Sequence, residues 1–443
     1  MPGPVVDPFH GDDDLPAAVD VVVIGGGIIG ATTALELAER GVRVALCEKG
    51  GIAGEQSSRN WGWVRISRRD PREVPLMAEA LRLWRGMDAR LGRPTGYLRS
   101  GIVFTCADEA ALAEAEGWAR ALGNWQIAHR MLSPEGFAAV VPGARLAVRG
   151  ALHTLDDGRA EPQKATPAIA ARARECGAHV LTECAVRGIE TQAGAVSGIV
   201  TERGPIAAPA VVLAGGAWSS LFAGRLGLDL PQLKVRNTVM RTAPLAGGPE
   251  PTISAGTFSV RKRADGGYTV ASWDRNLVDI VPASFRHARA FLPALRAEWR
   301  TLRFRVGGAF LDEARMPRTW AMDEASPFER TRVLDPAPAP GESERVLGVV
   351  RRHLPAFERA RIAQHWAGMI DVTPDAVPVI SPVARIPGFF IATGFSGHGF
   401  GIGPAAGRLM ADLVTGATPL VDPAAFRLGR FSDGTRMEIL GGY

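Results

Sequence analysis

The stretch that most constrains the fold lies at residues 21–49 and reads VVVIGGGIIGATTALELAERGVRVALCEK. An apolar run leads into a G-x-G-x-x-G turn, a segment of helical composition follows, and a second apolar run ends at Glu48. In such a unit Gly25 permits the tight turn, Gly27 lets the backbone approach a pyrophosphate, and Gly30 lets the helix pack against the strand. The sequence therefore predicts an α/β fold with a Rossmann-like dinucleotide site. The alternative is a glycine-rich turn in some other α/β protein.

Glu48 follows this turn by about twenty positions, where an acidic residue accepts hydrogen bonds from ribose hydroxyls. Its carboxylate would repel a 2′-phosphate, which disfavours NADP. The free N–H groups at the start of the helix, at Ile28 and Ile29, are expected to face the phosphates. Ser133 and Pro134 mark another helix start, with Ser133 as its cap.

Composition narrows the class of protein further. At 443 residues the chain is expected to form two or three domains. Its net charge is +5, but no basic run is interleaved with aromatic residues, so we expect no nucleic-acid partner, while contact with a membrane surface or an anionic substrate stays open. The four cysteines form no C-x-x-C pair, which predicts a reducing compartment, no disulfides and no metal site.

The first seventeen residues are acidic and rich in proline. We expect residues 1–17 to form a flexible or loosely packed N-terminal arm, and they lack the basic and apolar regions of a signal peptide. No apolar stretch is long enough to cross a membrane. A cytoplasmic location is therefore expected, and peripheral membrane contact stays open.

Two further strand-to-glycine turns occur, at Gly215 and at Gly394. One nucleotide needs only one such turn, whereas a long cofactor lying across a sheet edge needs several close backbone approaches. The turn from Gly394 to Gly401 immediately precedes a helical segment, whose N-terminus could hold the pyrimidine end of an isoalloxazine and stabilise negative charge on reduced flavin. Three unrelated surface turns are the alternative.

Five stretches, VVVIGGGIIG, GEQSSRNWGWVR, VVLAGGAWS, WAGMIDVTPDAVPVI and FIATGFSGHGFGIGPAAGRL, occur in this order and span nearly the whole chain. In them the chain resembles the D-amino acid oxidase-like family of flavoproteins, which includes sarcosine oxidase, glycine oxidase and D-amino acid dehydrogenase. The resemblance implies a Rossmann-like FAD-binding domain, discontinuous in sequence, over 18–98, 148–225 and 360–443. It also implies an inserted substrate domain with an antiparallel sheet, over 99–147 and 226–359.

The same resemblance implies oxidation of the C–N bond of an amine or amino acid by hydride transfer to flavin N5, giving an imine that water hydrolyses. The electron acceptor would be O₂ or a quinone-like molecule. Two alternatives use the same fold: a flavoprotein in tRNA modification and a non-catalytic FAD-binding subunit. The first would need an RNA-binding face, and the second would bind FAD without turnover.

The resemblance also assigns candidate residues. Arg65 would lie against the flavin, and His398 would contact it. Arg68, or another arginine near the flavin loop, would hold a substrate carboxylate, and the alternative is that Arg68 or Arg69 is simply a solvated surface charge. Asp371 could attract a cationic group. Trp61 and Trp63 could wall the active site or simply pack in the core. The predicted cofactor-binding residues are Gly25, Gly27, Ile28, Ile29, Gly30, Glu48, Lys49, Ser57, Ser58, Arg59, Asn60, Trp61, Val186, Gly215, Gly216, Trp218, Gly394, Ser396, Gly397, His398, Gly399 and Phe400.

Departures from the family pattern qualify the expected activity. Gly368 stands near the position where sarcosine oxidase-like members attach flavin to a cysteine, so we expect non-covalent FAD. Thr269 replaces a lysine that activates oxygen there, which favours a dehydrogenase over an oxidase. The arginine and lysine that grip the substrate carboxylate in relatives are also missing, around Asp371 and at Gly401. A larger amine or an N-substituted amino acid is therefore favoured over a simple α-amino acid.

Overall fold

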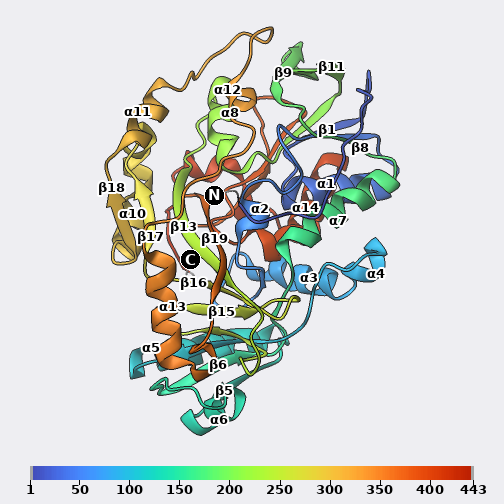
Figure 1. Ribbon diagram of the computed structural model, residues 1–443. Helices are drawn as coiled ribbons and strands as arrows, with labels where there is room; N and C mark the ends of the chain where they lie inside the picture. Colours follow the sequence, from blue (N-terminus) through green and yellow to red (C-terminus); the bar gives the residue numbers. More distant parts are fainter. Residues whose placement is uncertain (1–2, 441–443) are drawn as a thin grey trace.

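The computed structural model describes residues 3–440 and contains two large sheets at opposite ends of the molecule (Figure 1). Residues 1–2 of the predicted arm lie outside the described residues, and so do residues 441–443 of the predicted FAD-binding domain. The α/β fold class and the Rossmann-like unit are confirmed. Within 3–440 no helix is both long and apolar enough to cross a membrane.

The first sheet has six strands, and β1 lies in its interior. In spatial order the strands are β20 (Val379–Pro382), β21 (Phe389–Thr393), β12 (Ala210–Leu213), β1 (Val21–Ile24), β2 (Val44–Cys47) and β8 (His179–Leu181). All neighbours run parallel except β20 and β21. The first and third glycine turns therefore lie at the carboxyl ends of parallel strands, with the second, after β12, between them. This edge of a parallel sheet is where ligands bind.

Helices cover one face of this sheet, and a small sheet covers the other. The helices are α1 (Ile28–Glu39), α3 (Val74–Arg85), α7 (Pro162–Glu175) and α14 (Gly399–Thr415), and the small antiparallel sheet comprises β9 (Val186–Gln192), β10 (Ala195–Thr201) and β11 (Gly204–Ala207). Residues 28–38 of α1 are all buried, because α7 and α14 pack on either side of it. Glycine at 407 is required at the α1–α14 contact, since a Cβ there would lie 2.4 Å from Thr32 Oγ1.

The second sheet has ten strands and is mostly antiparallel, with parallel pairs only at β14–β4 and β17–β18. Its strands are β18 (Leu302–Arg305), β17 (Asn276–Asp279), β13 (Leu233–Thr242), β16 (Tyr268–Ala271), β15 (Ser259–Lys262), β14 (Thr252–Ser254), β4 (Ile102–Cys106), β6 (Gly150–Thr154) and β5 (His129–Leu132), and β19 (Ile362–Val372) pairs with β13. β13 and β19 are the longest strands and join this sheet to the cofactor side.

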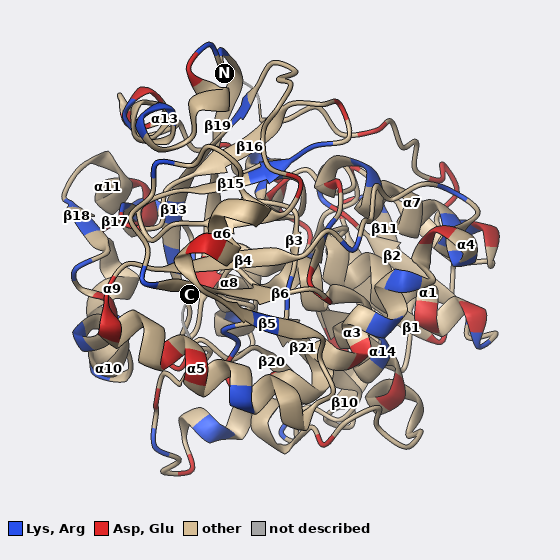
Figure 2. Cartoon of the chain, turned by 90° about the horizontal axis from the view of Figure 1, so that it is seen from below, with Lys and Arg blue, Asp and Glu red and all other residues tan. Residues whose placement is uncertain are grey.

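Shorter elements link and cover the two sheets. The two-stranded sheet consists of β3 (Trp63–Val64) and β7 (Gly158–Arg159). The remaining α-helices are α2 (Gln56–Arg59), α4 (Met87–Leu91), α5 (Glu109–Asn124), α6 (Pro134–Val140), α8 (Ser219–Arg225), α9 (Pro282–Arg286), α10 (Ala288–Glu298), α11 (Gly308–Arg315), α12 (Pro327–Arg330) and α13 (Glu342–His353). Ser133 caps α6, as predicted, and accepts from Gly136 N–H at 3.1 Å. Charges of both signs mix on α4 and α13 (Figure 2).

Two expectations need correction. β6 and β19 fall in ranges predicted for the FAD-binding domain, yet both pair within the second sheet. The predicted domain boundaries otherwise stay predictions. The N-terminal arm is not loosely packed over its described residues, because Asp7 N–H donates to Gln163 O at 3.0 Å and Asp12 N–H donates to Val180 O at 2.8 Å.

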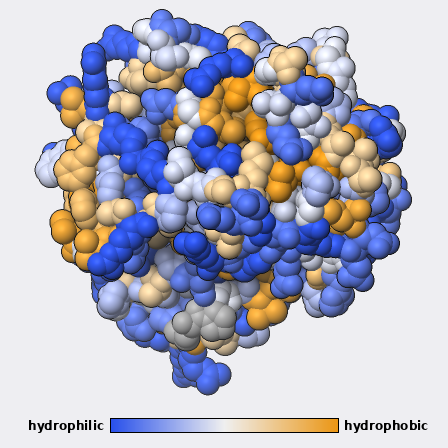
Figure 3. Space-filling view, turned by 90° about the horizontal axis from the view of Figure 1, so that it is seen from above, coloured by the Kyte–Doolittle hydropathy of each residue, from blue (hydrophilic) through white to orange (hydrophobic). Residues whose placement is uncertain are grey.

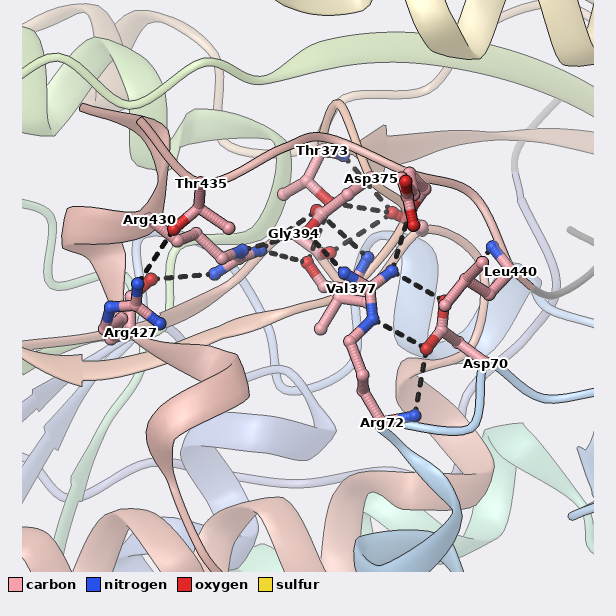
Figure 4. A network of polar contacts seen from close by, with 12 residues as sticks. Asp70, Arg72, Thr373, Asp375, Val377, Gly394, Arg427, Arg430, Thr435 and Leu440 are labelled. Carbon is pink, nitrogen blue, oxygen red and sulfur yellow. Dashed lines mark hydrogen bonds and ion pairs between the residues drawn. The ribbon is translucent and has the colours of Figure 1, made fainter. Parts of the chain in front are cut away.

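The C-terminal segment is tied down by a polar network (Figure 4). The buried Asp375 accepts from Arg430 Nε at 2.9 Å, and Arg72 contacts both Asp375 and Asp70. Leu440 N–H donates to Asp70 at 3.4 Å. These contacts fix the residues that lead into α3, which is the helix that begins beside the site.

Candidate active site

Two adjoining cavities open between the sheets. The smaller, of about 160 Å³, lies at the glycine turns of the six-stranded sheet. The larger, of about 440 Å³, lies beneath β13 and β19. Gln56, Asn60, Gly397 and Phe400 line both cavities, so the two form one continuous site.

The first glycine turn forms the floor of the smaller cavity. Gly25 has φ +111°, a conformation that favours glycine. A Cβ at position 30 would lie 1.9 Å from Gly25 O, so only glycine allows α1 to start this close to β1. A Cβ at position 27 would lie 3.0 Å from Ser57 Oγ, and that hydroxyl already accepts from Ile28 N–H at 2.8 Å. The backbone is therefore bare where a pyrophosphate would approach.

Glu48 forms one end of the same cavity. Its carboxylate accepts from Gly26 N–H at 2.6 Å and from Gly50 N–H at 2.8 Å. Burial raises the pKa of Glu48, while Lys49 and these two N–H groups oppose that shift. A buried, oriented carboxylate at this place fits the ribose of a dinucleotide.

Lys49 and Trp218 are fixed by Glu55 on the side of the cavity. Lys49 Nζ donates to Glu55 Oε1 at 2.6 Å, and Trp218 Nε1 donates to it at 3.0 Å. Lys49 also donates to the carbonyls of Thr331 and Arg332, both at 2.9 Å. The segment after α12 therefore closes over the cofactor side, although its composition resembles that of a surface loop.

Asp371 lies at the smaller cavity rather than facing a substrate, which corrects its predicted role. Its Oδ2 accepts from Gly394 N–H at 2.8 Å, from Gln232 Nε2 at 3.1 Å and from Thr393 Oγ1 at 3.3 Å. Burial raises the pKa of Asp371 to about 6. The carboxylate therefore anchors the third glycine turn and leaves few acceptor sites for a cationic substrate.

The predicted cofactor residues divide into three groups. Those that line the smaller cavity are Gly25, Gly27, Ile28, Ile29, Glu48, Lys49, Ser57, Asn60, Val186, Gly215, Gly216, Trp218, Gly397, Gly399 and Phe400. Those that line only the larger cavity are Arg59, Trp61, Ser396 and His398. Gly30, Ser58 and Gly394 line neither, and they shape the site from behind. Bare glycine backbone, a helix N-terminus and an acidic ribose partner in one elongated cavity fit FAD.

The larger cavity has an aromatic and aliphatic wall. Trp61, Trp63 and Trp273 meet edge to face, with ring centroids 4.7 to 5.7 Å apart. Trp61 is also oriented by its Nε1, which donates to Asn237 Oδ1 at 3.1 Å. Apolar side chains of β13, β19, α9, α10 and β18 complete the wall. Apolar surface gathers on the side of the molecule where Figure 1 places α10, α11 and β18 (Figure 3).

Two arginines bring positive charge to this apolar cavity. Arg65 lies 5.8 to 5.9 Å from the ring centroids of Trp63, Phe104 and Trp273, and its Nη1 donates to Ser67 O at 2.6 Å. Arg69 Nη1 is buried and has no hydrogen-bond partner within residues 3–440. Burial lowers the pKa of Arg65 well below its usual value, and it lowers the pKa of Arg69 to about 10, so Arg69 stays cationic near neutrality.

Arg68 does not line either cavity, which corrects its predicted role as the carboxylate anchor. It has φ +58°, and its half-exposed guanidinium pairs with Glu114 at 2.7 Å. The neighbouring Arg69 points inward instead. A sequence motif cannot separate two adjacent arginines, because the left-handed conformation of Arg68 itself sets which of the two faces the cavity.

His398 lies where predicted, at the start of α14 and on the wall of the larger cavity. Its Nδ1 is 3.5 Å from Glu73 Oε2, and both side chains are almost fully buried. Glu73 was not predicted from the sequence. Glu73 directly precedes α3. Its sequence neighbours do not distinguish it from an acidic residue that simply stands at the start of a helix.

Lys234 was also missed by sequence reasoning. It lines the larger cavity, 5.6 Å from the ring centroid of Trp218, and burial lowers its pKa. Thr269, the predicted replacement for a family lysine, is buried away from the cavity and accepts from Arg261 Nη2 at 3.0 Å. A cation is therefore present in the cavity, but it comes from β13 rather than from β16.

The position expected for covalent flavin attachment is crowded, and a side chain there would have to displace the end of Gln56. A Cβ at Gly368 would lie 2.2 Å from Gln56 Oε1 and 3.2 Å from Arg59 Cβ. None of the four cysteines lines the larger cavity, and Cys47 is buried beside the smaller one. Within residues 3–440, no cluster of three or more His, Cys, Asp or Glu residues suits a metal ion.

Comparison with known proteins places these features in context. A family described as FAD dependent oxidoreductase (DAO) matches residues 20–413. Glycine oxidase of Pseudomonas aeruginosa is 27% identical over 92% of this chain and 97% of its own length. The solved L-amino acid deaminase of Proteus myxofaciens, in complex with anthranilate, is 36% identical, with a TM-score of 0.94 over 98% of both chains. L-proline dehydrogenase of P. horikoshii is 25% identical, with a TM-score of 0.78 over 96% of this chain and all of that one.

Proposed function

This chain belongs to the family of FAD-dependent oxidoreductases that act on amino acids and amines, and from that premise we propose that it deaminates an L-α-amino acid with a large apolar side chain. The observation that carries this proposal is the larger cavity. It combines an apolar, aromatic wall with the unpartnered guanidinium nitrogen of Arg69 and adjoins the cofactor cradle. The names of the relatives solved as L-amino acid deaminase and L-proline dehydrogenase support the L configuration.

The proposed reaction balances as an oxidation followed by hydrolysis. Bound FAD supplies a two-electron acceptor. The substrate loses its Cα hydrogen as hydride and a proton from nitrogen, which gives an imino acid. Water then adds to the C=N carbon and releases ammonia and a 2-oxo acid. The residues of this chain bind and orient the substrate, and the apolar wall excludes bulk water from the Cα–N bond.

Arg69 is the proposed carboxylate anchor. A buried N–H group without a partner costs free energy, and a substrate carboxylate would remove that cost with a charge-assisted hydrogen bond. The sequence-based preference for a larger amine or an N-substituted amino acid over a simple α-amino acid rested on missing carboxylate anchors, and Arg69 would supply one. The side chain of the substrate would then lie against Trp61, Trp63 and Trp273.

FAD is proposed to be held without a covalent bond. Glu48 would bind the ribose, the N-terminus of α1 would face the pyrophosphate, and the turn at Gly397 and Gly399 would face the flavin. Gly368 is too crowded to carry an attachment cysteine. Acid precipitation of the purified holoprotein should therefore release all flavin into the supernatant, whereas flavin in the pellet would contradict this proposal.

Anaerobic reduction of the bound flavin tests the function directly. The FAD-loaded protein is mixed with L- and D-phenylalanine, L-leucine, glycine, sarcosine and phenethylamine, and bleaching of the flavin absorbance is followed. We expect L-phenylalanine and L-leucine to bleach fastest. Phenethylamine matches phenylalanine but lacks the carboxylate, so equal rates for the two would contradict the role of Arg69. Bleaching by no compound would favour a non-catalytic FAD-binding protein.

The electron acceptor is proposed to be quinone-like rather than O₂, as expected from the sequence. The sequence favoured a dehydrogenase because Thr269 replaces a lysine of the relatives. Thr269 does not line the larger cavity, whereas Lys234 does. Stopped-flow reoxidation of substrate-reduced protein decides the matter. Reoxidation in air that is slower than reduction supports a dehydrogenase, and equally fast reoxidation would identify an oxidase with Lys234 as the first residue to vary.

A further inference from the structure

Glu73 and His398 form a buried pair that the proposed reaction does not use. Glu73 Oε2 lies 3.5 Å from His398 Nδ1, and the side chains are 0% and 6% exposed. Neither carboxylate oxygen of Glu73 and neither ring nitrogen of His398 has a hydrogen-bond partner within residues 3–440. Four unpartnered polar atoms at one place are unusual, because each costs free energy when buried. The pair therefore needs an explanation beyond packing.

The charges around Glu73 come from the segment that leads into α3 and from the loop before α14. Arg65, Arg69, Asp70 and Arg72 face Glu73 from its own segment, and His398 faces it from the other side. Burial raises the pKa of Glu73 to about 7, although Arg69 and Arg65 oppose the shift. Glu73 is thus an acid that exchanges a proton near neutrality, and it lies 3.5 Å from a ring nitrogen of His398 that can bind a proton.

His398 links this pair to both cavities. Its ring lines the larger cavity, and its neighbours Gly397 and Gly399 line the smaller one. Because Nδ1 faces Glu73, Nε2 is the ring nitrogen left for a group in the cavity. The helix α14 starts immediately after His398, so its N-terminal N–H groups lie at the same junction.

We propose that Glu73 and His398 share one proton at the junction of the two cavities, and that Glu73 is the positioning residue that sets the orientation and charge of the His398 ring. This inference rests on the proposed function only in placing the flavin at that junction. With the proton, the pair is neutral overall, as acid plus imidazole or as carboxylate plus imidazolium. Without the proton, the pair carries one negative charge, which opposes reduction of a cofactor that gains negative charge.

The first test measures the reduction potential of the bound flavin by equilibration with redox dyes, without substrate, at pH values on both sides of 7. The wild-type protein should show a change of slope near the pKa of the pair. Glu73→Gln keeps the shape but never carries the charge, so the change of slope should vanish and the potential above it should rise. Glu114→Gln is the control, because it removes an exposed carboxylate and should leave the profile unchanged.

The second test measures the protonation of Glu73 directly. The C=O stretch of a protonated carboxylic acid is followed by infrared difference spectroscopy during a pH titration. A band that fades near neutral pH and is absent in Glu73→Gln is expected. This measurement needs no substrate and no turnover, so it stands even if the proposed reaction is wrong.

A second variant guards against loss of cofactor in Glu73→Gln. His398→Gln should move the change of slope to another pH, together with the infrared titration of Glu73, because the proton would no longer be shared. The inference is overturned if the change of slope persists in Glu73→Gln, or if it stays at the wild-type pH in His398→Gln. It is equally overturned if Glu73 titrates at the same pH with and without His398.

Discussion

The two cavities are built by different means. The smaller cavity is made of backbone: glycine turns at Gly25, Gly215 and Gly397, with Glu48 bound to two N–H groups at one end. The larger cavity is made of side chains that come from loops, from β13 and β19, and from α9 and α10. A backbone cradle tolerates almost no substitution at its glycines, whereas a side-chain wall can change its lining one residue at a time. The first is therefore suited to a fixed cofactor and the second to a selected substrate.

The two cavities also differ in what supports them. Behind the smaller cavity, α1 is buried along nearly its whole length between α7 and α14. Beside the larger cavity, α9 and α11 have no fully buried residue, and Phe285, Trp299 and Phe304 are more than half exposed. Substitutions in the first region should therefore affect folding and cofactor together, and those in the second should affect substrate alone.

The largest effect is expected at the cradle. Gly30→Ala places a Cβ 1.9 Å from Gly25 O, so α1 must move away from β1. Overpacking of this kind costs about 3 kcal/mol, and we expect loss of bound flavin with a clear fall in Tm. Gly51→Ala is the control, because no atom lies within 4 Å of the added carbon. Flavin retention equal to that of the control would show that the motif does not form the cradle.

Arg69 tests the polar end of the larger cavity. Arg69→Met should lower kcat/KM for the best amino acid about 100-fold, equivalent to about 2.7 kcal/mol, because a charge-assisted hydrogen bond to the carboxylate is lost. Turnover of a carboxylate-free amine should not change. Arg68→Met removes the same charge one residue away, outside the cavity, and should have no comparable effect. If the two variants behave alike, Arg69 is not the anchor.

Asp157 tests the buried charge that surrounds the site. Its carboxylate accepts from Ile66 N–H at 2.6 Å, and burial raises its pKa to about 6. A raised folded-state pKa means that the folded protein binds the proton more tightly, so stability is greatest below the unfolded pKa and is lost as pH rises through about 6. The shift of this pKa from 3.8 to about 6 corresponds to a total loss of about 3 kcal/mol.

Asp157→Asn should therefore flatten the fall in unfolding free energy of the cofactor-free protein between about pH 4 and about pH 7. Urea unfolding at the two pH values measures it. Glu73 and Asp371 change stability in the same direction and remain in the variant, so part of the fall should persist. Asp312→Asn, at an exposed position, serves as control. If the unfolding free energy of Asp157→Asn falls with pH as much as that of the control, Asp157 does not have the raised pKa.

The smallest effect is expected in the apolar wall. Leu295 lines the larger cavity and is 39% exposed, so Leu295→Asn should fold normally and retain FAD. Loss of one apolar contact should weaken the binding of a large apolar substrate by about 1 kcal/mol. This should raise KM for that substrate and change KM for alanine little. Val306→Asn lies in the same segment but outside the cavity and is the matched control. An equal change in KM for both substrates would show that the apolar wall does not select the substrate.

The sequence predicted the parts of the fold that depend on neighbouring residues. The strand, turn, helix and strand of residues 21–49 form as expected, and so does the Ser133 cap. These features follow from local φ/ψ requirements and from caps, which a single sequence reveals. The apolar spacing of residues 74–91 would suit a single helix, but the structure divides this stretch into α3 and α4 at Gly86, because spacing alone does not fix a helix boundary.

The site was predicted only where a motif defines it. Glu48, Gly27 and His398 lie at the cavities, while Arg68 and Asp371 have roles other than those expected. Arg69, Glu73 and Lys234 were missed. Each comes from an ordinary helix start, loop or strand, and only folding places Arg69 and Lys234 on the larger cavity and Glu73 beside His398.

By itself, the sequence determined a dinucleotide cradle and membership of a flavoprotein family, because glycines and one acid at fixed spacing act through local backbone geometry. Its preference for a ribose without a 2′-phosphate stays a prediction. Only the tertiary structure decided which arginine lines the larger cavity, that the loop after α12 closes over Lys49, and that Glu73 meets His398. These contacts join residues more than 250 positions apart. Their energies depend on burial and on partner charges, which no stretch of sequence contains until the chain is folded.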